Sequence, residues 1–544
     1  MPATTIGDDE KAGVRTVVFH HLSGMVLAPT VKALHDRNVF ELFADRSRWV
    51  ELDHIAERTH GNRGYLRVAL RLLASCGWLK QRTFESGRRA AYMLTPEGVL
   101  GINLAPPLYS DVVSFMPKAI FLEDFLFGTS DEPILPSLRE LAARSRARWG
   151  IPSHQEAVGA KVGEQIRTHV DGMVVGPAMV ALARGGILAQ LEEGFVNLPA
   201  IAANPASLGC VFDFLSTQGW IAFEQNSVRL TARGRYAAQI ATSYGVTVSY
   251  LPLFKLVSTL LFGNPHVPRV DESGGELLVN RGMNVWGSGG AHKTYFKRVD
   301  EIIVEIFNRP INVQPRGICD MGCGDGTFLE HLYSVVRKQT ARGQALDKHP
   351  LVVVGADFNK VARRVAKQTL RRAGIQTFHV IGGNINRPAQ LASDLEQLGL
   401  DIHDLLHVRS FLDHNRPYIR PGNGVNRIGR STGAFAHLGE EIPPDQLEEN
   451  LVRHLRRWAP YIGRFGLLVL ELHTLPPELT AANLDKTPAV AYDGTHGFSD
   501  QYLMELPIFL DCAREAGLQA DPRYEAKFPP SDLATVSINF FTAV

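Results

Sequence analysis

The sequence holds few cysteines, and none is spaced for cross-linking or for metal binding. Five cysteines are scattered over 544 residues without a C-x-x-C pair. This usage argues against a disulfide framework and against a thiolate zinc site. It predicts a protein of the reducing cytosol.

The sequence also lacks an excess of charge of either sign and a long apolar run. Its formal net charge is +1, which gives no reason to expect a nucleic acid or an acidic membrane as partner. No uninterrupted apolar stretch reaches the roughly 18 residues of a membrane span, and residues 250–263 are too few and include Lys255. The first residues are polar and acidic, unlike a signal peptide. At this length, we expect a soluble protein of about three domains.

What the sequence does contain is an internal repeat in its first half. HLSGMVLAP, which begins two residues after Phe19, lines up with HVDGMVVGP, which begins at His169. A Gly-Trp pair recurs at Trp78 and Trp220. Each copy has the pattern of helices followed by a short hairpin. Two copies of one unit therefore follow each other, and we place them at residues 1–130 and 131–263.

This unit resembles the winged-helix module that precedes the catalytic domain of many small-molecule methyltransferases. In single-copy relatives the module usually forms a homodimer, so the duplication predicts that the two copies pack on each other and that the protein is a monomer. A winged helix can also bind DNA, and Arg63, Arg67 and Arg71 of the first copy would suit that role. The second copy offers no comparable charge, and we expect no nucleic-acid partner.

A Gly-rich turn between a strand and a helix organises the second half. An apolar run ends at Asp320, glycines follow at Gly322, Gly324 and Gly326, and apolar residues then recur at helical spacing. Glycine suits a turn with unusual dihedral angles and a ligand that approaches bare backbone. The pattern D-x-G-x-G-x-G resembles motif I of class I S-adenosylmethionine (SAM) methyltransferases rather than the G-x-G-x-x-G of dinucleotide enzymes.

Further strands follow in the order of a Rossmann-like domain. We predict parallel strands at 351–357, 378–386, 401–408 and 465–471, an extended loop at 337–350 and a closing edge hairpin at 534–541. The expected fold class is therefore α/β: a class I SAM methyltransferase Rossmann-like domain preceded by a mainly helical region with two tandem winged-helix-like repeats.

The polar, Gly-rich segment between the two halves is expected to be a linker and lid. It spans residues 264–310, with a helix from 292 to 308, and the methyltransferase domain then occupies residues 311–544.

The resemblance also implies which residues hold SAM. Asp357 ends the second strand and suits the ribose hydroxyls. Asn384 and Ile385 follow the third strand, where relatives contact the adenine. The predicted cofactor contacts are Asp320, Gly322, Cys323, Gly324, Asp357, Phe358, Asn384, Ile385 and Arg409.

Two polar clusters fall where strands should end at the ligand edge of the sheet. One is SFLDHNRPY, directly after the fourth strand, and the other is HGFSDQY, expected as a loop that enters a helix capped by Ser499. A capping role is open for each cluster, but two clusters at this edge are also candidates for chemistry.

With the helical region before them, these clusters resemble the iron- or manganese-dependent C-methyltransferases of polyketide assembly lines, of the apratoxin malonyl starter-unit type. The resemblance implies one mononuclear metal held by His414 and Gln501, and catalytic roles for His414, Asp413 and His496. Asp413 or Asp500 would accept the other imidazole N–H. Imidazole and amide ligands suit iron or manganese, and an ion that chelates a 1,3-dicarbonyl stabilises its enolate.

The expected activity is therefore metal-assisted C-methylation of a malonyl-type or β-dicarbonyl acyl group, either a small molecule or bound to a carrier protein. Two alternatives stay open. One is a metal-free O-methyltransferase with His414 or His473 as general base. The other is a SAM-binding scaffold whose duplicated half docks partners.

Overall fold

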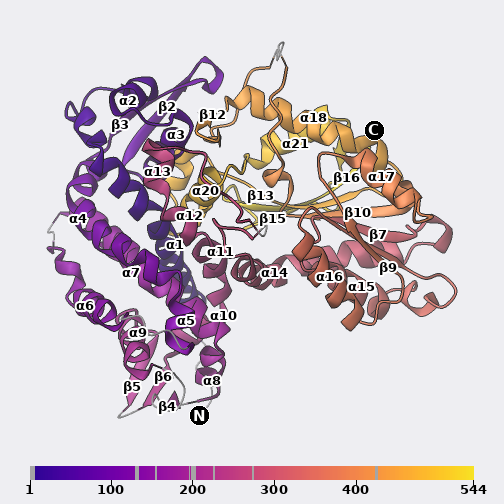
Figure 1. The fold of residues 1–544 in the computed structure, drawn as a ribbon, viewed down its shortest axis with the longest axis horizontal. Helices are drawn as coiled ribbons and strands as arrows, with labels where there is room; N and C mark the ends of the chain where they lie inside the picture. Colours follow the sequence, from indigo (N-terminus) through magenta and orange to yellow (C-terminus); the bar gives the residue numbers. More distant parts are fainter. Residues whose placement is uncertain are drawn as a thin grey trace.

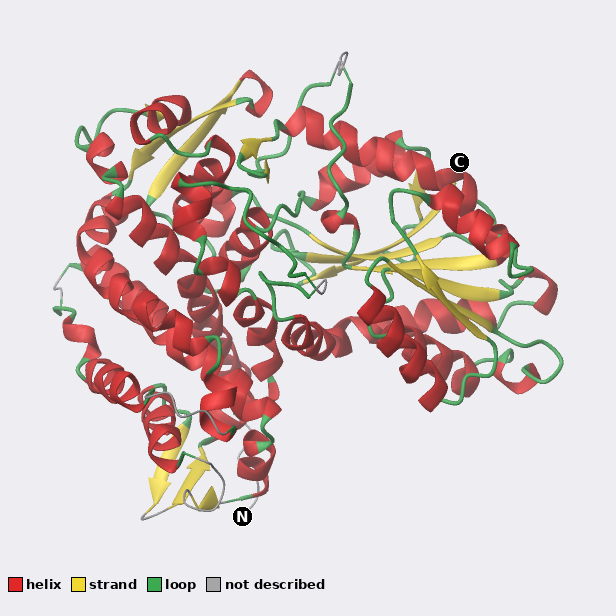
Figure 2. Cartoon of the chain, in the orientation of Figure 1, coloured by secondary structure: helices red, strands yellow, loops and turns green. Residues whose placement is uncertain are grey.

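A helical N-terminal half and a sheet-based C-terminal half are joined by one long helix, α14 (Arg281–Phe307) (Figure 1). The computed structural model describes residues 6–128, 134–153, 156–194, 196–197, 204–224, 227–272, 275–422 and 427–543. Figure 2 shows helices predominating on one side and a twisted sheet between helices on the other.

The two copies of the repeat have equivalent elements and equivalent three-stranded antiparallel sheets, ordered β1-β3-β2 and β4-β6-β5. The first copy comprises α1 (Asp8–Asp36), β1 (Val50–Glu51), α2 (Leu52–Thr59), α3 (Arg63–Ser75), β2 (Leu79–Phe84), β3 (Arg89–Leu94) and α4 (Pro96–Ala119). The second comprises α7 (Ala157–Arg184), α8 (Ile187–Glu193), β4 (Val196–Asn197), α9 (Pro205–Thr217), β5 (Ile221–Glu224), β6 (Ser227–Leu230) and α10 (Ala232–Gln239). Shorter helices complete this half: α5 (Leu122–Phe127), α6 (Leu135–Arg146), α11 (Gly245–Ser249), α12 (Leu251–Phe254) and α13 (Val257–Phe262).

The copies pack on each other through their long helices, α1 and α7, as the repeat predicts. A Cβ atom on Gly24 would lie 2.3 Å from the carbonyl oxygen of His169, and one on Gly172 would lie 2.5 Å from the Cα of His21. These four residues occupy matching places in the repeat. Glycine is therefore required at both sites because backbone meets backbone.

A reciprocal pair of buried hydrogen bonds reinforces this contact. His21 Nδ1 lies 2.7 Å from the hydroxyl of Tyr244 in the second copy, and His169 Nδ1 lies 2.7 Å from the hydroxyl of Tyr109 in the first. Such exchange is the property of a two-fold interface, here built within one chain. The oligomeric state itself stays a prediction.

Among the residues that the structure describes, one helix, α1, is long and apolar enough to cross a membrane, although 78% of its apolar window is buried inside the protein. A core helix of this kind passes the same length and composition test. The bent pair α7–α8 passes only if both helices are taken together across a 76° break.

The C-terminal sheet has the strand order β14-β16-β13-β10-β7-β8-β9, with β15 paired to β16. Strands β7 to β10 and β13 run parallel, and β16 is antiparallel to β13. The order reverses between β7 and β10, which is where such sheets bind ligands. The strands are β7 (Gly317–Met321), β8 (Val352–Asp357), β9 (Phe378–Gly382), β10 (Leu405–Ser410), β13 (Leu467–Leu472), β14 (Leu518–Ala520), β15 (Ala526–Phe528) and β16 (Val536–Ala543).

Helices cover both faces of this sheet (Figure 1), so the predicted class I α/β fold is confirmed. They are α15 (Thr327–Gln339), α16 (Lys360–Arg372), α17 (Pro388–Glu396), α18 (Pro444–Ile462), α19 (Pro477–Ala481), α20 (Ala489–Phe498) and α21 (Leu506–Glu515). A small hairpin, β11 (Ala436–His437) and β12 (Glu440–Glu441), lies between the sheet domain and α3.

Several predicted boundaries were wrong. The fourth strand begins at Leu405 rather than 401, because Ile402–Asp404 form a 3-10 turn. The closing strand β16 is not at the edge, since it pairs with β13 on one side and β14 on the other. The predicted loop at 337–350 begins with the last turn of α15, which extends to Gln339.

The predicted linker at 264–310 is largely helix, because α14 begins at Arg281 rather than 292. Its glycines had suggested a flexible segment. However, a Cβ on Gly287 would lie 2.6 Å from the Cα of Gly245, so Gly287 allows close packing against α11.

Candidate functional site

The Gly-rich turn and Asp357 form one connected structure at the carboxyl end of the sheet. Gly322, Gly324 and Gly326 have φ values of +84°, +54° and +82°, a region that favours glycine. The N–H of Gly324 donates to Asp357 Oδ2 at 3.0 Å, which joins the turn to the end of β8. Burial and the nearby charge of Asp357 raise the pKa of Asp320 to about 8.

The remaining predicted cofactor contacts divide into two groups. Phe358 is 82% exposed directly after Asp357, where a ligand could cover it. Cys323 and Ile385 are buried, and Asn384 Oδ1 accepts the N–H of Asn386. These positions agree with the predicted cofactor edge, and their binding roles stay predictions.

Arg409 differs from the others because its guanidinium is fully buried. It donates from Nη1 to Asp413 Oδ1 at 2.7 Å and lies 4.1 Å from the ring centre of Trp458. His454 Nε2 lies 2.9 Å from the same carboxylate oxygen. Burial alone would raise the pKa of Asp413, but the charge of Arg409 and the hydrogen bond with His454 hold it well below its usual range. Asp413 and Arg409 thus bind each other in the interior, and their predicted catalytic and cofactor-binding roles stay predictions.

His414, the next residue, faces a different partner. Its Nδ1 lies 2.5 Å from Glu471 Oε1, and its backbone N–H donates to Glu471 Oε2 at 3.1 Å. Glu471 is the acceptor that we had predicted to be Asp413 or Asp500. It lies near the end of β13, and the signal that identified Asp357, an acid closing an apolar strand, applied to it equally.

The rings of His414 and His496 lie 5.0 Å apart, edge to face. His496 Nδ1 lies 2.7 Å from the carbonyl oxygen of Tyr492, which makes Nδ1 the protonated nitrogen. Burial and His414 lower the pKa of His496 to about 3, so this imidazole is neutral. In the described part of the chain, neither imidazole has a hydrogen-bond partner at Nε2.

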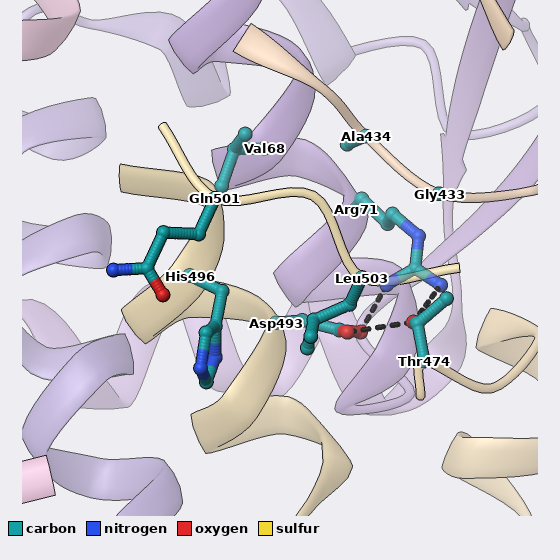
Figure 3. A pocket seen from close by; sticks show the side chains of 10 residues that line it. Val68, Arg71, Gly433, Ala434, Thr474, Asp493, His496, Gln501 and Leu503 are labelled. Atoms are coloured by element: carbon teal, nitrogen blue, oxygen red, sulfur yellow. Dashed lines mark hydrogen bonds and ion pairs between the residues drawn. The ribbon is translucent and has the colours of Figure 1, made fainter. Parts of the chain in front are cut away.

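Gln501 lies next to His496 (Figure 3). Its amide lies beside the His496 imidazole, and both side chains line one pocket. Gln501 Nε2 donates to the hydroxyl of Tyr250 at 3.1 Å, which assigns the carbonyl oxygen as the free end. Backbone bonds fix the segments: the N–H of Gln501 donates to the carbonyl of His496, and the N–H of Tyr502 to that of His414.

The second cluster has a different local structure from the predicted one. His496 lies in the last turn of α20, and Ser499 follows the helix instead of capping the start of the next one. Ser499 Oγ donates to the carbonyl of Thr495. Asp500 accepts hydrogen bonds from Tyr65 and Arg269, 2.7 Å each, and is therefore not the acceptor of the His414 ring N–H.

His473, the other base considered for an O-methyltransferase, uses both ring nitrogens. Nδ1 lies 3.1 Å from the carbonyl of Met504, and Nε2 lies 2.7 Å from Ser537 Oγ. Burial lowers its pKa to about 4. His473 is thus a structural residue.

The first winged-helix repeat supplies one wall of the pocket through Val68 and Arg71 of α3. Arg71 forms a buried ion pair with Asp493, and its Nη2 donates to Thr474 Oγ1 at 3.0 Å (Figure 3). Arg67 is likewise buried and paired with Glu441. The arginines that would have suited DNA are therefore used to join the two halves.

Helix α20, which carries His496, packs closely against α1 and α3 of the first repeat at two glycines. A Cβ on Gly494 would lie 2.0 Å from Val26 of α1, and a Cβ on Gly497 would lie 2.7 Å from Val68 of α3. The duplicated half thus determines where α20 lies.

Three families match successive parts of the chain. An AprA MT2-like domain matches residues 276–539, an AprA N-terminal domain residues 14–81, and an AprA winged helix domain residues 171–264. The chain is a SAM-dependent methyltransferase. The match at 276–539 covers the turn, Asp357 and both histidine clusters of this methyltransferase.

Individual proteins resemble it more distantly. A 2-ketoarginine methyltransferase of Streptomyces arginensis is 24% identical over 209 residues, which are 38% of this chain and 57% of that protein. The match thus spans less than two thirds of the relative. The structure of mitomycin 7-O-methyltransferase MmcR aligns with 71% of this chain and 99% of its own, at 13% sequence identity and a TM-score of 0.41. An O-methyltransferase family protein from Burkholderia thailandensis aligns with 72% of this chain and 99% of its own, at 13% identity and a TM-score of 0.40.

Proposed function

We propose that this methyltransferase transfers the SAM methyl group to carbon, on a malonyl-type or β-dicarbonyl acyl group of natural-product (polyketide) biosynthesis, with the help of one iron or manganese ion. The observation that carries the proposal is the group formed by His414, His496 and Gln501. Each has one polar end anchored, to Glu471, the Tyr492 carbonyl and the Tyr250 hydroxyl respectively, and one end free.

This anchoring is what a metal site requires. A ligating imidazole normally donates its other N–H to a carboxylate or a carbonyl, which fixes the tautomer and the ring. The described residues contain no cluster of three or more His, Cys, Asp or Glu side chains placed to hold an ion. The proposed ligands are one imidazole and one amide, which suit iron or manganese and leave positions open for the substrate. The residues present therefore fit the ion.

His414 Nε2 and Gln501 Oε1 would hold the ion, which when bound would stabilise an enolate of a chelated 1,3-dicarbonyl. The other residues bind, orient and move a proton. His496, kept neutral by burial, offers Nε2 as acceptor for the proton that leaves the carbon. Glu471 orients His414. Asp413, bound to Arg409 and His454, fixes the turn that carries His414.

The name of the bacterial relative supports a carbon acceptor, because a 2-keto acid, like a 1,3-dicarbonyl, has an acidic hydrogen beside its carbonyl. One observation favours the alternative O-methyltransferase, namely the 2.5 Å contact between His414 and Glu471. A carboxylate beside an imidazole also makes a general base.

Metal analysis of purified protein separates the two functions. We expect about one iron or manganese per chain in the wild type, and loss of that metal in His414→Ala and Gln501→Ala with SAM affinity unchanged. The control is His349→Ala, an exposed imidazole of the same domain. Full methyl transfer after exhaustive chelation would favour the O-methyltransferase, with His414 as its base.

The cofactor site has its own test. Asp357→Ala should weaken SAM binding by about 2–3 kcal/mol, because two hydrogen bonds to a charged group are lost. Calorimetry measures this directly. An unchanged affinity would place the ribose elsewhere.

A further inference from the structure

Helix α16 carries a strongly basic surface on a protein whose net charge is only +1. Its thirteen residues hold six Lys or Arg and no Asp or Glu. Lys360, Arg364, Lys367 and Arg371 are exposed, and none of them forms an ion pair with any residue that the structure describes. Asp325 lies in the adjacent turn, which packs on α16 through Gly326 and Ala366, and forms no ion pair with it either.

These four cations form one ridge, which we call the basic ridge. They follow one another at spacings of four, three and four residues, which places them on one side of an α-helix. Like charges at these spacings destabilise a helix. Local stability therefore does not account for the pattern.

A second ridge lies beside the basic one. Val361 is 58% exposed and Val365 36% exposed, one turn apart. The opposite side of α16 packs on strands β8 and β9 of the sheet and carries the buried residues Ala366 and Leu370. The exposed surface of α16 thus combines a row of cations with two apolar side chains, and the valines offer contact area that a protein can cover and a phosphate cannot use.

The position of α16 connects this surface with the active site. The helix begins directly after Asp357, and Asn359, which caps it, donates its backbone N–H to Asp357 Oδ1 at 2.7 Å. A partner on α16 would therefore contact the carboxyl edge of the sheet, where the Gly-rich turn lies, at the start of the helix beside Lys360 and Val361, while the rest of the basic ridge runs away from this edge.

We propose that α16 docks the carrier protein that delivers the acyl substrate, through an acidic helix lying on the basic ridge and the two valines. This inference rests on the proposed function, since it names the partner that would bring the acyl group to that site. The complementary charges would raise the rate of association and make it depend on salt.

The test compares carrier-bound malonyl with malonyl-pantetheine, the same acyl thioester without the carrier protein. The variant Arg364→Glu, Lys367→Glu, Arg371→Glu should raise KM for the malonyl carrier protein at least tenfold and abolish its salt dependence. The KM for malonyl-pantetheine, the kcat and the SAM affinity should not change.

A matched control makes the same change of net charge elsewhere. Arg46→Glu, Arg58→Glu, Lys80→Glu alters three exposed cations of the first repeat and should leave both KM values at the wild-type level. Equal effects of the two triple variants, or equal effects on both substrates, would overturn the proposal. A third result would also overturn the proposal: the α16 variant loses binding to duplex DNA or to anionic vesicles, while its KM for the carrier protein stays unchanged.

Failure of the proposed function gives a different result. If wild-type protein methylates neither thioester, the function is wrong, and docking is still decided by calorimetric binding of the malonyl carrier protein to wild type and to the α16 variant. Equal affinities would overturn the docking surface, and a tenfold loss in the variant would support it.

Discussion

The two winged-helix repeats share one fold but differ in what their third helices contact. In the first repeat, α3 lies against the catalytic domain and carries Arg71, which is buried in an ion pair with Asp493. In the second repeat, α9 packs on α6 and α7 instead. The position aligned with Arg71 is Asp213, which pairs with Arg146 at the surface.

This difference shows what the duplication makes possible. In a symmetric dimer both copies must keep the same sequence. Within one chain, α3 of the first copy can become a wall of the pocket, while α9 at the same place in the second copy packs elsewhere. The reciprocal contacts of His21 and His169 retain the symmetry, and α3 and α9 have lost it.

The largest expected effect comes from Arg71→Met. It leaves Asp493 buried without its partner, which costs about 3–5 kcal/mol of unfolding free energy, and it should abolish methyl transfer because α20 loses its support. Asp213→Ala at the aligned position should cost less than about 1 kcal/mol. Urea denaturation and activity assays measure both. Similar losses in the two variants would mean that the repeats are not specialised.

Substitution of the crossing glycines should have smaller but symmetric effects. Gly24→Val and Gly172→Val each force α1 and α7 apart and should cost about 1–3 kcal/mol. Gly209→Ala provides the contrast, because a Cβ there meets no atom within 4 Å and should stabilise α9 by about 0.5–1 kcal/mol. A large effect at only one crossing glycine would contradict the two-fold contact.

The hydroxyls of Tyr109 and Tyr244 should contribute less still. Removing either one as Tyr→Phe deletes one buried hydrogen bond to a histidine, worth about 1 kcal/mol. We expect the two variants to lose equal amounts and the double variant to lose their sum. Chemical denaturation of the two single variants and the double variant measures these losses. Unequal losses would mean that the two-fold symmetry holds for the backbone contact of α1 and α7 but not for the hydrogen bonds.

The smallest expected effect is that of dilution. Because the second repeat occupies the place of a dimer partner, the protein should remain a monomer and keep its specific activity across a wide range of concentration. Light scattering and assays at matched concentrations check this. A tight dimer built through α1 and α7 would contradict the internal pairing.

The sequence was informative where the chemistry restricts the residue type. The turn from Asp320 to Gly326 and the acid at Asp357 identified their structures, because few other residues could take those places. The aligned segments that begin at His21 and His169 identified the repeat. The order of the parallel strands followed from apolar runs of strand length.

It was misleading where a residue served tertiary packing. Gly287 suggested a linker but allows α14 to approach α11. Arg67 and Arg71 suggested a DNA-binding helix, yet their partners, Glu441 and Asp493, lie hundreds of residues away. Glu471 was overlooked although it closes an apolar strand as Asp357 does, and its contact with His414 appears only in the folded chain.

The position of the transferred methyl group tests the central claim most directly. The claim is that the group formed by His414, His496 and Gln501 supports methylation at carbon. Reaction of a malonyl thioester with SAM carrying a ¹³C-labelled methyl, followed by NMR of the product, reports the atom to which the label is bound. The account predicts a label bonded to the carbon between the two carbonyls, formed only by protein that contains its metal. A label on oxygen, or a carbon-bound label formed equally by metal-free protein, would contradict it.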